Sequence, residues 1–212
     1  MNSKDKSTPI GNISNNTSRF SPVSVQESPV KKSVNLTGNV RQVRDCVADL
    51  FNLIQEWNSL HLIGCTMLRS ISDLKLPSLN DTKVDGGSCY TQPLQLLCNQ
   101  LDSTCSKLKE IFQKMEIVLK NLSGITKLEQ FQNVSKILFL TWQTSQFEKT
   151  CQDIVAAYLT ELNLKMYVKS NVAHCTTKAS LMFHVASWVH QPYIEEYISF
   201  KLETMLKETG HR

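Results

Sequence analysis

Residues 187–197, SWVHQPYIEEY, gather a tryptophan, a histidine, a proline and two tyrosines. His190 could act there as a general acid, a general base or a metal ligand. Pro192 follows two residues later, however, and predicts a change of chain direction at the end of a helix. A histidine in the last helical turn more often hydrogen-bonds a terminal carbonyl, as the helix dipole favours. We therefore expect a corner between two helices, covered by Trp188 and Tyr193, with their N–H and O–H groups at a wet edge.

Metal binding and catalysis find little support elsewhere in the chain. The best set of metal ligands is His174, Cys175, His184 and His190. Adjacent residues on a helix diverge by about 100°, and positions 184 and 190 are not one turn apart. The sequence also lacks the nucleophile-elbow, P-loop, zinc-protease and dinucleotide-binding motifs. We expect no metal, no cofactor and no enzymatic activity.

Composition narrows the class of protein further. The net charge is +4 over 212 residues and no run of five Lys or Arg occurs, so we expect no direct nucleic-acid binding. No stretch approaches the ~18 apolar residues that cross a bilayer, which predicts no membrane span. The beginning of the chain lacks the apolar core of a secretory signal. Seven cysteines without a C-x-x-C pair then predict reduced thiols in a reducing compartment.

Residues 1–38 are rich in Ser, Asn, Lys and Pro, with isolated apolar residues at no period. Such a segment buries too little surface to offset its ordering entropy, so we expect a disordered tail. Within it, Ser28 is followed by Pro29 and then by Lys31. This context suits phosphorylation of Ser28 by a proline-directed kinase. A Pro-rich linker that is never modified is the alternative.

A helical stripe begins at residue 40. Its apolar residues follow steps of three and four through Trp57 and resume after one short step, which predicts a coiled-coil type helix over residues 39–76. Asn39 is expected to cap its start and Pro77 to end it. Leu53 and Ile63 widen the apolar face beyond one seam, so we expect more than one neighbouring helix.

The clearest heptad in the chain runs from Leu94 to Leu122. Pro93 suits the first turn of this second helix, and Ser123-Gly124 is expected to end it. Two long helices cannot bury both stripes on each other, so we expect part of this stripe to bind a partner helix. Packing within the monomer is the alternative. The predicted partner-binding residues are Leu94, Leu97, Leu101, Leu108, Ile111 and Met115 of the stripe, together with Trp188 and Tyr193 as aromatic anchors.

The rest of the chain predicts one extended segment and three shorter helices. Residues 137–142, ILFLTW, have no helical period, and we expect them to pack Leu138, Leu140 and Trp142 onto the helices. The expected helix starts are Thr144 or Ser145 for the third helix, Thr176 or Thr177 for the fourth, and Pro192 for the fifth.

The sequence thus predicts an all-α fold in three parts. Residues 1–38 are the tail, residues 39–123 form a long antiparallel helical hairpin of coiled-coil type, and residues 124–212 form a small helical bundle packed on the hairpin. We expect Trp142, Trp188 and Tyr193 at the centre of that small bundle.

A resemblance to a known family rests on four stretches: RDCVADLFNLIQEWNSL (44–60), LFLTWQTSQF (138–147), WVHQPYIEEY (188–197) and KLETMLKETGHR (201–212). They are similar to the cyclin-dependent kinase 2-interacting protein family. The resemblance covers most of the chain after about residue 40, and the two C-terminal stretches are its most specific part.

The resemblance implies a non-catalytic nuclear adaptor. Its implied partners are a cyclin-dependent kinase with its cyclins, an origin-firing kinase, the ATR-interacting protein, and AAA-type ATPase subunits with a small coiled-coil partner. Its implied setting is DNA replication, the DNA-damage checkpoint and large-ribosomal-subunit maturation. The residues themselves leave two other functions open: a self-assembling structural coiled coil, and an enzyme built on His190.

Overall fold

The computed structural model describes residues 38–80, 91–133 and 136–212, and these ranges contain five α-helices and one short 3-10 helix. The helices are α1 (Asn39–Asn80), α2 (Gln92–Phe131), α3 (Thr144–Asn171), α4 (Lys178–His190) and α5 (Glu196–Glu208), with η1 (Val172–His174) between α3 and α4. The only β-type pairing in the same ranges is an isolated bridge between Ile137 and Gln143. The predicted all-α class is confirmed. The predicted tail, with Ser28, lies outside the described residues apart from Gly38.

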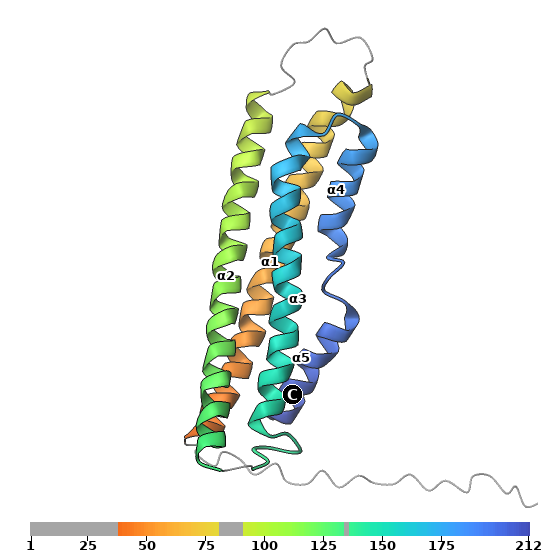
Figure 1. Ribbon diagram of the computed structural model, residues 1–212. Helices are drawn as coiled ribbons and strands as arrows, with labels where there is room; N and C mark the ends of the chain where they lie inside the picture. Colours follow the sequence, from red (N-terminus) through yellow and green to blue (C-terminus); the bar gives the residue numbers. More distant parts are fainter. Residues whose placement is uncertain (1–37, 81–90, 134–135) are drawn as a thin grey trace, which may run out of the picture. The chain divides into compact units, whose positions relative to one another are not determined.

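The long helices α1 and α2 lie side by side and run in opposite directions (Figure 1). Near one end, Asn39 Nδ2 donates to Glu129 Oε1 at 3.1 Å. Further along, Thr104 Oγ1 donates to Met67 Sδ at 3.6 Å. These two contacts show that α1 and α2 are antiparallel. The coiled-coil winding of this pair stays a prediction.

The other helices close these two into a single bundle. Helix α3 packs along α2, and α4 and α5 lie one after the other (Figure 1), each in contact with both α3 and α1. Lys169 Nζ on α3 bonds Asp102 Oδ1 on α2 at 2.7 Å, and Lys201 on α5 pairs with Asp153 on α3. The described residues form one compact unit. It is an up-down-up-down four-helix bundle whose fourth helix is broken in two.

The prediction that Trp142, Trp188 and Tyr193 lie together at the centre of the C-terminal helices is wrong for Tyr193. Trp188 is buried against α1, and Trp142 packs edge-on against Phe147 with ring centroids 5.0 Å apart. Tyr193 is exposed. Sequence periodicity could not separate these positions, because it shows which residues face inward but not which helix they face.

Two predicted helix ends are also wrong. Pro77 lies inside α1, one turn from its end, where Leu76 and Leu79 pack against the core. Gly124 lies inside α2, which continues to Phe131. A helical glycine costs about 1 kcal/mol relative to alanine, and the burial of Ile125 just beyond it offsets that cost. The predicted boundary between residues 123 and 124 therefore falls within a helix.

The other helix ends follow local chemistry. Pro93 lies in the first turn of α2, and the Thr177 hydroxyl caps α4 by accepting from Ser180 N at 3.2 Å, so both predictions are confirmed. Helix α3 is capped one residue earlier than predicted, at Gln143. Helix α4 ends at His190, and its C-cap residue Gln191 is left-handed with φ 45°. A right-handed helical conformation is disfavoured at Gln191 because Pro192 follows it.

Helix α5 does not begin at Pro192 but at Glu196. Residues 191–195 therefore form a linker between the two halves of the fourth helix. In the extended segment before α3, Leu138 and Trp142 are half-buried as predicted. Leu140 is exposed, and its predicted packing onto the helices is wrong.

The chain itself covers the heptad stripes except at Leu74, the last residue of the α1 stripe, which is 42% exposed. The stripe of α2 is buried or half-buried along its length because α1 and α3 flank α2 on two sides. The prediction of a surplus apolar stripe, left open for a partner helix, is therefore wrong. Fully buried members of the two stripes include Val43, Val47, Leu50, Trp57, Ile71, Leu101, Leu108, Met115 and Leu122.

Candidate functional site

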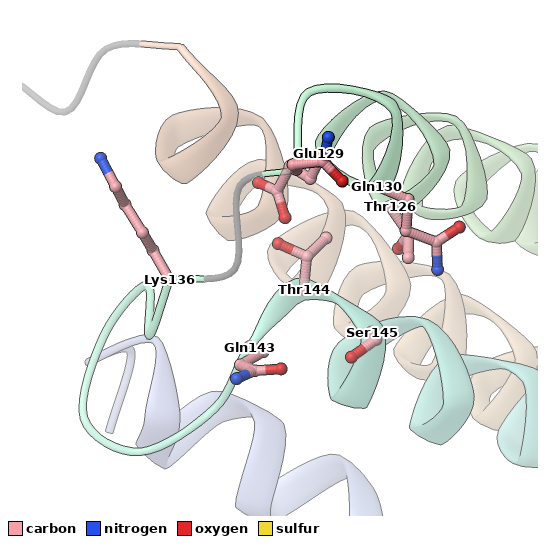
Figure 2. Close-up of a pocket in the computed structure, with 8 residues that line it drawn as sticks. Thr126, Glu129, Gln130, Lys136, Gln143, Thr144 and Ser145 are labelled. Atoms are coloured by element: carbon pink, nitrogen blue, oxygen red, sulfur yellow. The ribbon is translucent and has the colours of Figure 1, made fainter.

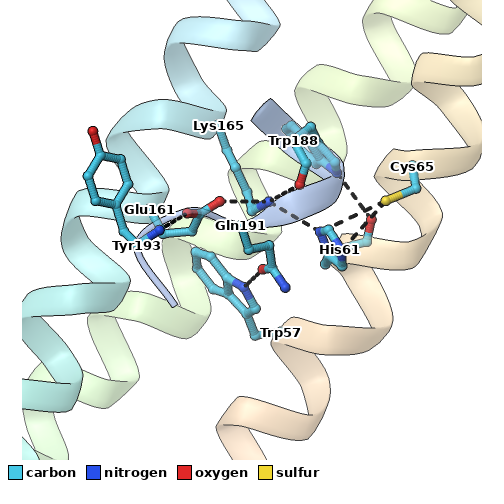
Figure 3. Close-up of polar contacts among 8 residues, drawn as sticks. All are labelled: Trp57, His61, Cys65, Glu161, Lys165, Trp188, Gln191 and Tyr193. Carbon is cyan, nitrogen blue, oxygen red and sulfur yellow. Dashed lines mark hydrogen bonds and ion pairs between the residues drawn. The ribbon is translucent and has the colours of Figure 1, made fainter. Parts of the chain in front are cut away.

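A cluster of polar side chains lies in the core of the bundle, where α1, α3 and α4 meet (Figure 3). Its centre is an ion pair between Lys165 Nζ and Glu161 Oε1, 3.1 Å apart and one turn apart on α3. Both side chains are fully buried, with 0% exposure. A buried ion pair holds only when further hydrogen bonds compensate for the lost water.

The neighbours of Lys165 supply those bonds. Its ammonium donates to Trp188 O at 3.3 Å and lies 3.2 Å from His61 Nδ1. It also sits over the Trp188 indole, 4.3 Å from the ring centroid, which is a favourable cation–π arrangement. Burial lowers the pKa of Lys165, and the negative charge of Glu161 opposes that shift. On the other side, Glu161 Oε2 accepts from the Tyr193 backbone N–H at 3.3 Å, which ties the linker to α3.

His61 is neutral in this cluster. Burial, followed by the charge of Lys165, lowers the pKa of His61 to about 4. Because Nδ1 faces the ammonium, it must act as the acceptor, so the ring proton lies on Nε2. Nε2 then points to Cys65 Sγ, 3.6 Å away.

The His61–Cys65 pair is not a catalytic dyad. A nucleophilic cysteine needs an ionised thiol, stabilised by a protonated neighbour. Here burial raises the pKa of Cys65 and lowers that of His61, so both groups stay neutral near pH 7. The arrangement favours structural hydrogen bonding over nucleophilic chemistry.

Two tryptophans join the cluster to the helix corner. Trp188 Nε1 donates to the His61 carbonyl at 3.2 Å, and its ring packs on Gly64 of α1. A Cβ atom at Gly64 would lie 2.2 Å from Trp188 Cζ2, so only glycine fits under the indole. Trp57 Nε1 donates to Gln191 Oε1 at 3.0 Å and fixes the C-cap residue of α4. The hydrogen bonds of Trp57 and Trp188 therefore tie the corner to α1.

A polar pocket of about 400 Å³ lies where α2 ends and α3 begins (Figure 2). The Thr144 hydroxyl lines it and is buried with no hydrogen-bond partner among the described residues. Glu129 and Lys136 give the pocket charges of both signs. This mixture does not define a ligand class. The lining residues are Thr126, Glu129, Gln130, Asn133, Lys136, Gln143, Thr144 and Ser145.

Exposed aromatic side chains occur on α5 and on the linker before it. Tyr197 and Phe200 lie three residues apart on α5, and Tyr193 lies just before that helix. Their exposed fractions are 60%, 64% and 48%. We name these three residues the α5 aromatic surface. Exposed aromatic residues are the side chains most often central to protein interfaces.

Comparison with known proteins decides the family. The chain is 32% identical over 195 residues to a human protein named "Cyclin-dependent kinase 2-interacting protein", and 33% identical to the mouse protein of that name. Both matches cover 84% of this chain and 92% of the relative. A Xenopus laevis protein of the same name is 30% identical over 194 residues, covering 85% and 94%. No family model matches the chain.

The chain belongs to the cyclin-dependent kinase 2-interacting protein family. The relatives are named for an interaction rather than for a reaction. The predicted resemblance is confirmed, and its two C-terminal stretches now have structural roles. WVHQPYIEEY builds the corner described above. In KLETMLKETGHR, Glu208 accepts from Thr141 and Trp142 backbone N–H groups at 2.9 and 3.2 Å and holds the segment before α3.

The predicted partner-binding residues differ in their exposure to solvent. Leu94, Leu101, Leu108, Ile111, Met115 and Trp188 are buried inside the bundle, Leu97 is half-buried, and Tyr193 is exposed. Trp188 therefore does not sit at a wet edge as predicted. Partner binding by Tyr193 stays a prediction.

The four residues considered as the best candidate metal ligands, His174, Cys175, His184 and His190, do not form a cluster among the described residues. His190 is exposed in the last turn of α4, whereas His184 is buried between Tyr167 and Phe183, with ring centroids 5.6 and 5.7 Å away. Burial lowers the pKa of His184. Within residues 38–80, 91–133 and 136–212, no cluster of His, Cys, Asp or Glu could hold a metal ion. None of the helices in these ranges contains an apolar stretch that would span a lipid bilayer.

Proposed function

We propose that this chain is a non-catalytic adaptor that binds a cyclin-dependent kinase 2 through the α5 aromatic surface. The observation that carries the proposal is the family match, because relatives named for this interaction align over 84% of the chain. The fold supports a binding role. The titratable groups of the buried cluster bond one another and the backbone of Tyr193, so their polar atoms hold the helices together.

The α5 aromatic surface has the chemistry of an interface centre. Phe200 and Tyr193 present large apolar areas, and the linker that carries Tyr193 is fixed by its backbone bond to Glu161. A rigid aromatic side chain loses little conformational entropy when a partner covers it. Binding would therefore bury these rings without reorganising the bundle.

The test is direct binding between the purified chain and a purified kinase–cyclin complex, measured by calorimetry. The Tyr193→Ala/Phe200→Ala variant is expected to raise Kd at least about tenfold, as for interface hot spots. The matched control is Leu96→Ala, which removes an equally exposed apolar side chain from α2. No binding of the unaltered chain would refute the kinase interaction. Equal loss in the control and the double variant would refute the assignment to this surface.

The wider role is proposed on the family likeness. We infer a nuclear protein that also contacts an origin-firing kinase, the ATR-interacting protein and an AAA-type ATPase assembly, in replication, the damage checkpoint and large-ribosomal-subunit maturation. Purification of the tagged chain from nuclear extract, with co-eluting proteins identified by mass spectrometry, tests this role. Recovery of the chain from the cytoplasmic fraction alone would refute the nuclear assignment. Phosphorylation at Ser28 is tested in the same sample by peptide mapping.

Self-assembly is the weaker function for this fold. A structural coiled coil needs an open heptad stripe, and the stripes of α1 and α2 are covered within the chain except at Leu74. We expect a monomer in sedimentation at micromolar concentration. A stable oligomer without partners would favour the structural role instead.

A further inference from the structure

The outer face of α1 and α2, away from the core, carries a long surface groove. Two hollows of about 560 and 400 Å³ lie along the seam between these helices, and both are lined by Asp49 and Asn121. We name the joined hollows the outer groove. Its α2 wall extends from Lys114 to Leu128, which at 1.5 Å per residue is roughly 20 Å.

The floor of the outer groove is apolar. Cys46 and Leu53 contribute from α1, and Val118 and Ile125 contribute from α2. These four side chains are between 5 and 9% exposed, so they are core residues that remain reachable from the groove. Ile117 and Leu128 stand on the α2 side with 54 and 47% exposure. Burying such side chains on a partner is the usual source of helix-in-groove affinity.

The two rims carry opposite charges. On the α1 rim Asp45, Asp49 and Glu56 follow one another at helical spacing. On the α2 rim Lys114 and Lys120 line the same hollows. The fit is to a ligand with positive charge along one side and negative charge along the other, since complementary flanking charges select the partner in helix pairs.

Gly124 lies on the α2 side of the outer groove, in the middle of a helix. A helical glycine is destabilising relative to alanine. Gly64 has a reason within the chain, because Trp188 occupies the space of its Cβ. At Gly124 a Cβ would meet nothing within 4 Å among the described residues. The space above Gly124 is thus open, and it admits the close approach of another backbone.

We infer that the outer groove binds an amphipathic α-helix of another protein. Its apolar seam lies on the floor, a small residue packs over Gly124, Lys or Arg side chains face the acidic α1 rim, and Glu or Asp side chains face the basic α2 rim. A second copy of this chain fits less well, because two facing copies would oppose one concave surface to another. The inference goes beyond the kinase interaction and uses a different face of the bundle.

The probe is a synthetic helical peptide of about 18 residues, long enough to span the groove, with a Leu and Ala seam, Lys on one flank and Glu on the other. The control is a peptide of the same composition whose order has no helical period. Fluorescence anisotropy with the full chain is expected to give binding at least about tenfold tighter for the helical peptide. Equal or absent binding of the two peptides would overturn the inference.

Variants of the protein locate the site. Gly124→Leu fills the groove and is expected to weaken the peptide at least about tenfold, whereas Gln113→Leu, at an exposed α2 position outside the groove, leaves binding unchanged. Asp49→Lys with Glu56→Lys is expected to weaken the Lys/Glu peptide and to favour a peptide with Glu on both flanks. Unchanged affinity in these variants would overturn the assignment.

Two further readouts separate the alternatives. Gly124→Ala is expected to raise Tm by about 2–4 °C, the effect of improved helix propensity in a chain of this size, while it lowers peptide affinity. Self-association of the chain that Gly124→Leu abolishes would overturn the inference in favour of a second copy. Gly124→Leu is expected to leave the Kd for the kinase unchanged, whereas Tyr193→Ala/Phe200→Ala is expected to raise it. The kinase proposal and the groove proposal can therefore be refuted independently of each other.

Discussion

Gly64→Ala is the substitution with the clearest expected effect on this bundle. Alanine is the better helix former, so at an exposed helical position the change stabilises by about 1 kcal/mol. At position 64 the added methyl group would lie 2.2, 2.6 and 2.8 Å from three atoms of the Trp188 indole. Real Cβ atoms do not approach other atoms that closely, so the indole or the α1 backbone must move.

The indole cannot move freely. Its Nε1 donates to the His61 carbonyl, and the buried Lys165 ammonium lies over its face. Overpacking of a core costs about 1–3 kcal/mol, and this site is at the upper end because the ring is rigid and held from two sides. After the gain in helix propensity of about 1 kcal/mol, we expect a net loss of about 2 kcal/mol. That loss corresponds to a fall in Tm of about 4–8 °C for a chain of this length.

The assay is urea unfolding and thermal unfolding followed by circular dichroism, with Gly124→Ala as the matched control. The control is expected to gain stability because nothing occupies the space of its Cβ. In a Trp188→Phe background Gly64→Ala is expected to cost less, since phenylalanine lacks the Nε1 and fused-ring atoms that would clash. A Gly64→Ala protein as stable as the unaltered chain would refute the packing of Trp188 on α1.

Three other predictions concern buried polar groups. Lys165→Met leaves the Glu161 carboxylate unpaired and is expected to cost about 3–5 kcal/mol in urea unfolding, whereas Lys165→Met with Glu161→Leu is expected to cost less; equal losses would contradict the pairing. Because the pKa of His61 is lowered to about 4, its contribution to stability is present above pH 6.5 and is lost as pH falls towards 4, by up to about 3 kcal/mol. His61→Gln is expected to remove that part of the pH dependence, and an unchanged stability difference between the two proteins from pH 7 to pH 4 would count against it. Burial alone would raise the pKa of Glu208, but hydrogen bonds from residues 141 and 142 outweigh it and lower that pKa; Glu208→Gln is expected to speed hydrogen exchange at the Trp142 amide and leave α4 protection unchanged, and equal protection in both proteins would refute the tether.

The positions of the helices and their buried faces were predictable from the sequence. Which helix packs against each buried face was not predictable. Steps of three and four place Leu101 and Leu108 on one face of α2, and that face is indeed the buried one. Periodicity cannot say whether α3 or a foreign helix covers it. The apolar pattern of α3 was visible in the sequence. Its packing along α2 was not, because a periodic pattern does not identify the neighbouring helix.

The buried polar cluster escaped sequence reasoning for a physical reason. Glu161 and Lys165 each lie one position before a residue of the apolar stripe of α3, where charged residues normally face water. That stripe consists of Phe147, Cys151, Ile154, Tyr158, Leu162 and Met166. Only their spacing of four, typical of a helical ion pair, gave a signal. Gly64 and Trp188 are too far apart in sequence for any local pattern to join them. The corner at Pro192 was predictable because proline restricts its own backbone and that of the residue before it.

The buried polar cluster around Lys165 favours a single axial alignment of the helices. A wholly apolar interior would allow one helix to slide past another by a heptad with little loss, since one leucine replaces another. A slide here would leave an ammonium and a carboxylate facing hydrocarbon. We expect the Lys165→Met/Glu161→Leu protein to keep its helical content yet show more than one set of amide resonances for α3. A single sharp set would show that side-chain shape alone selects the alignment.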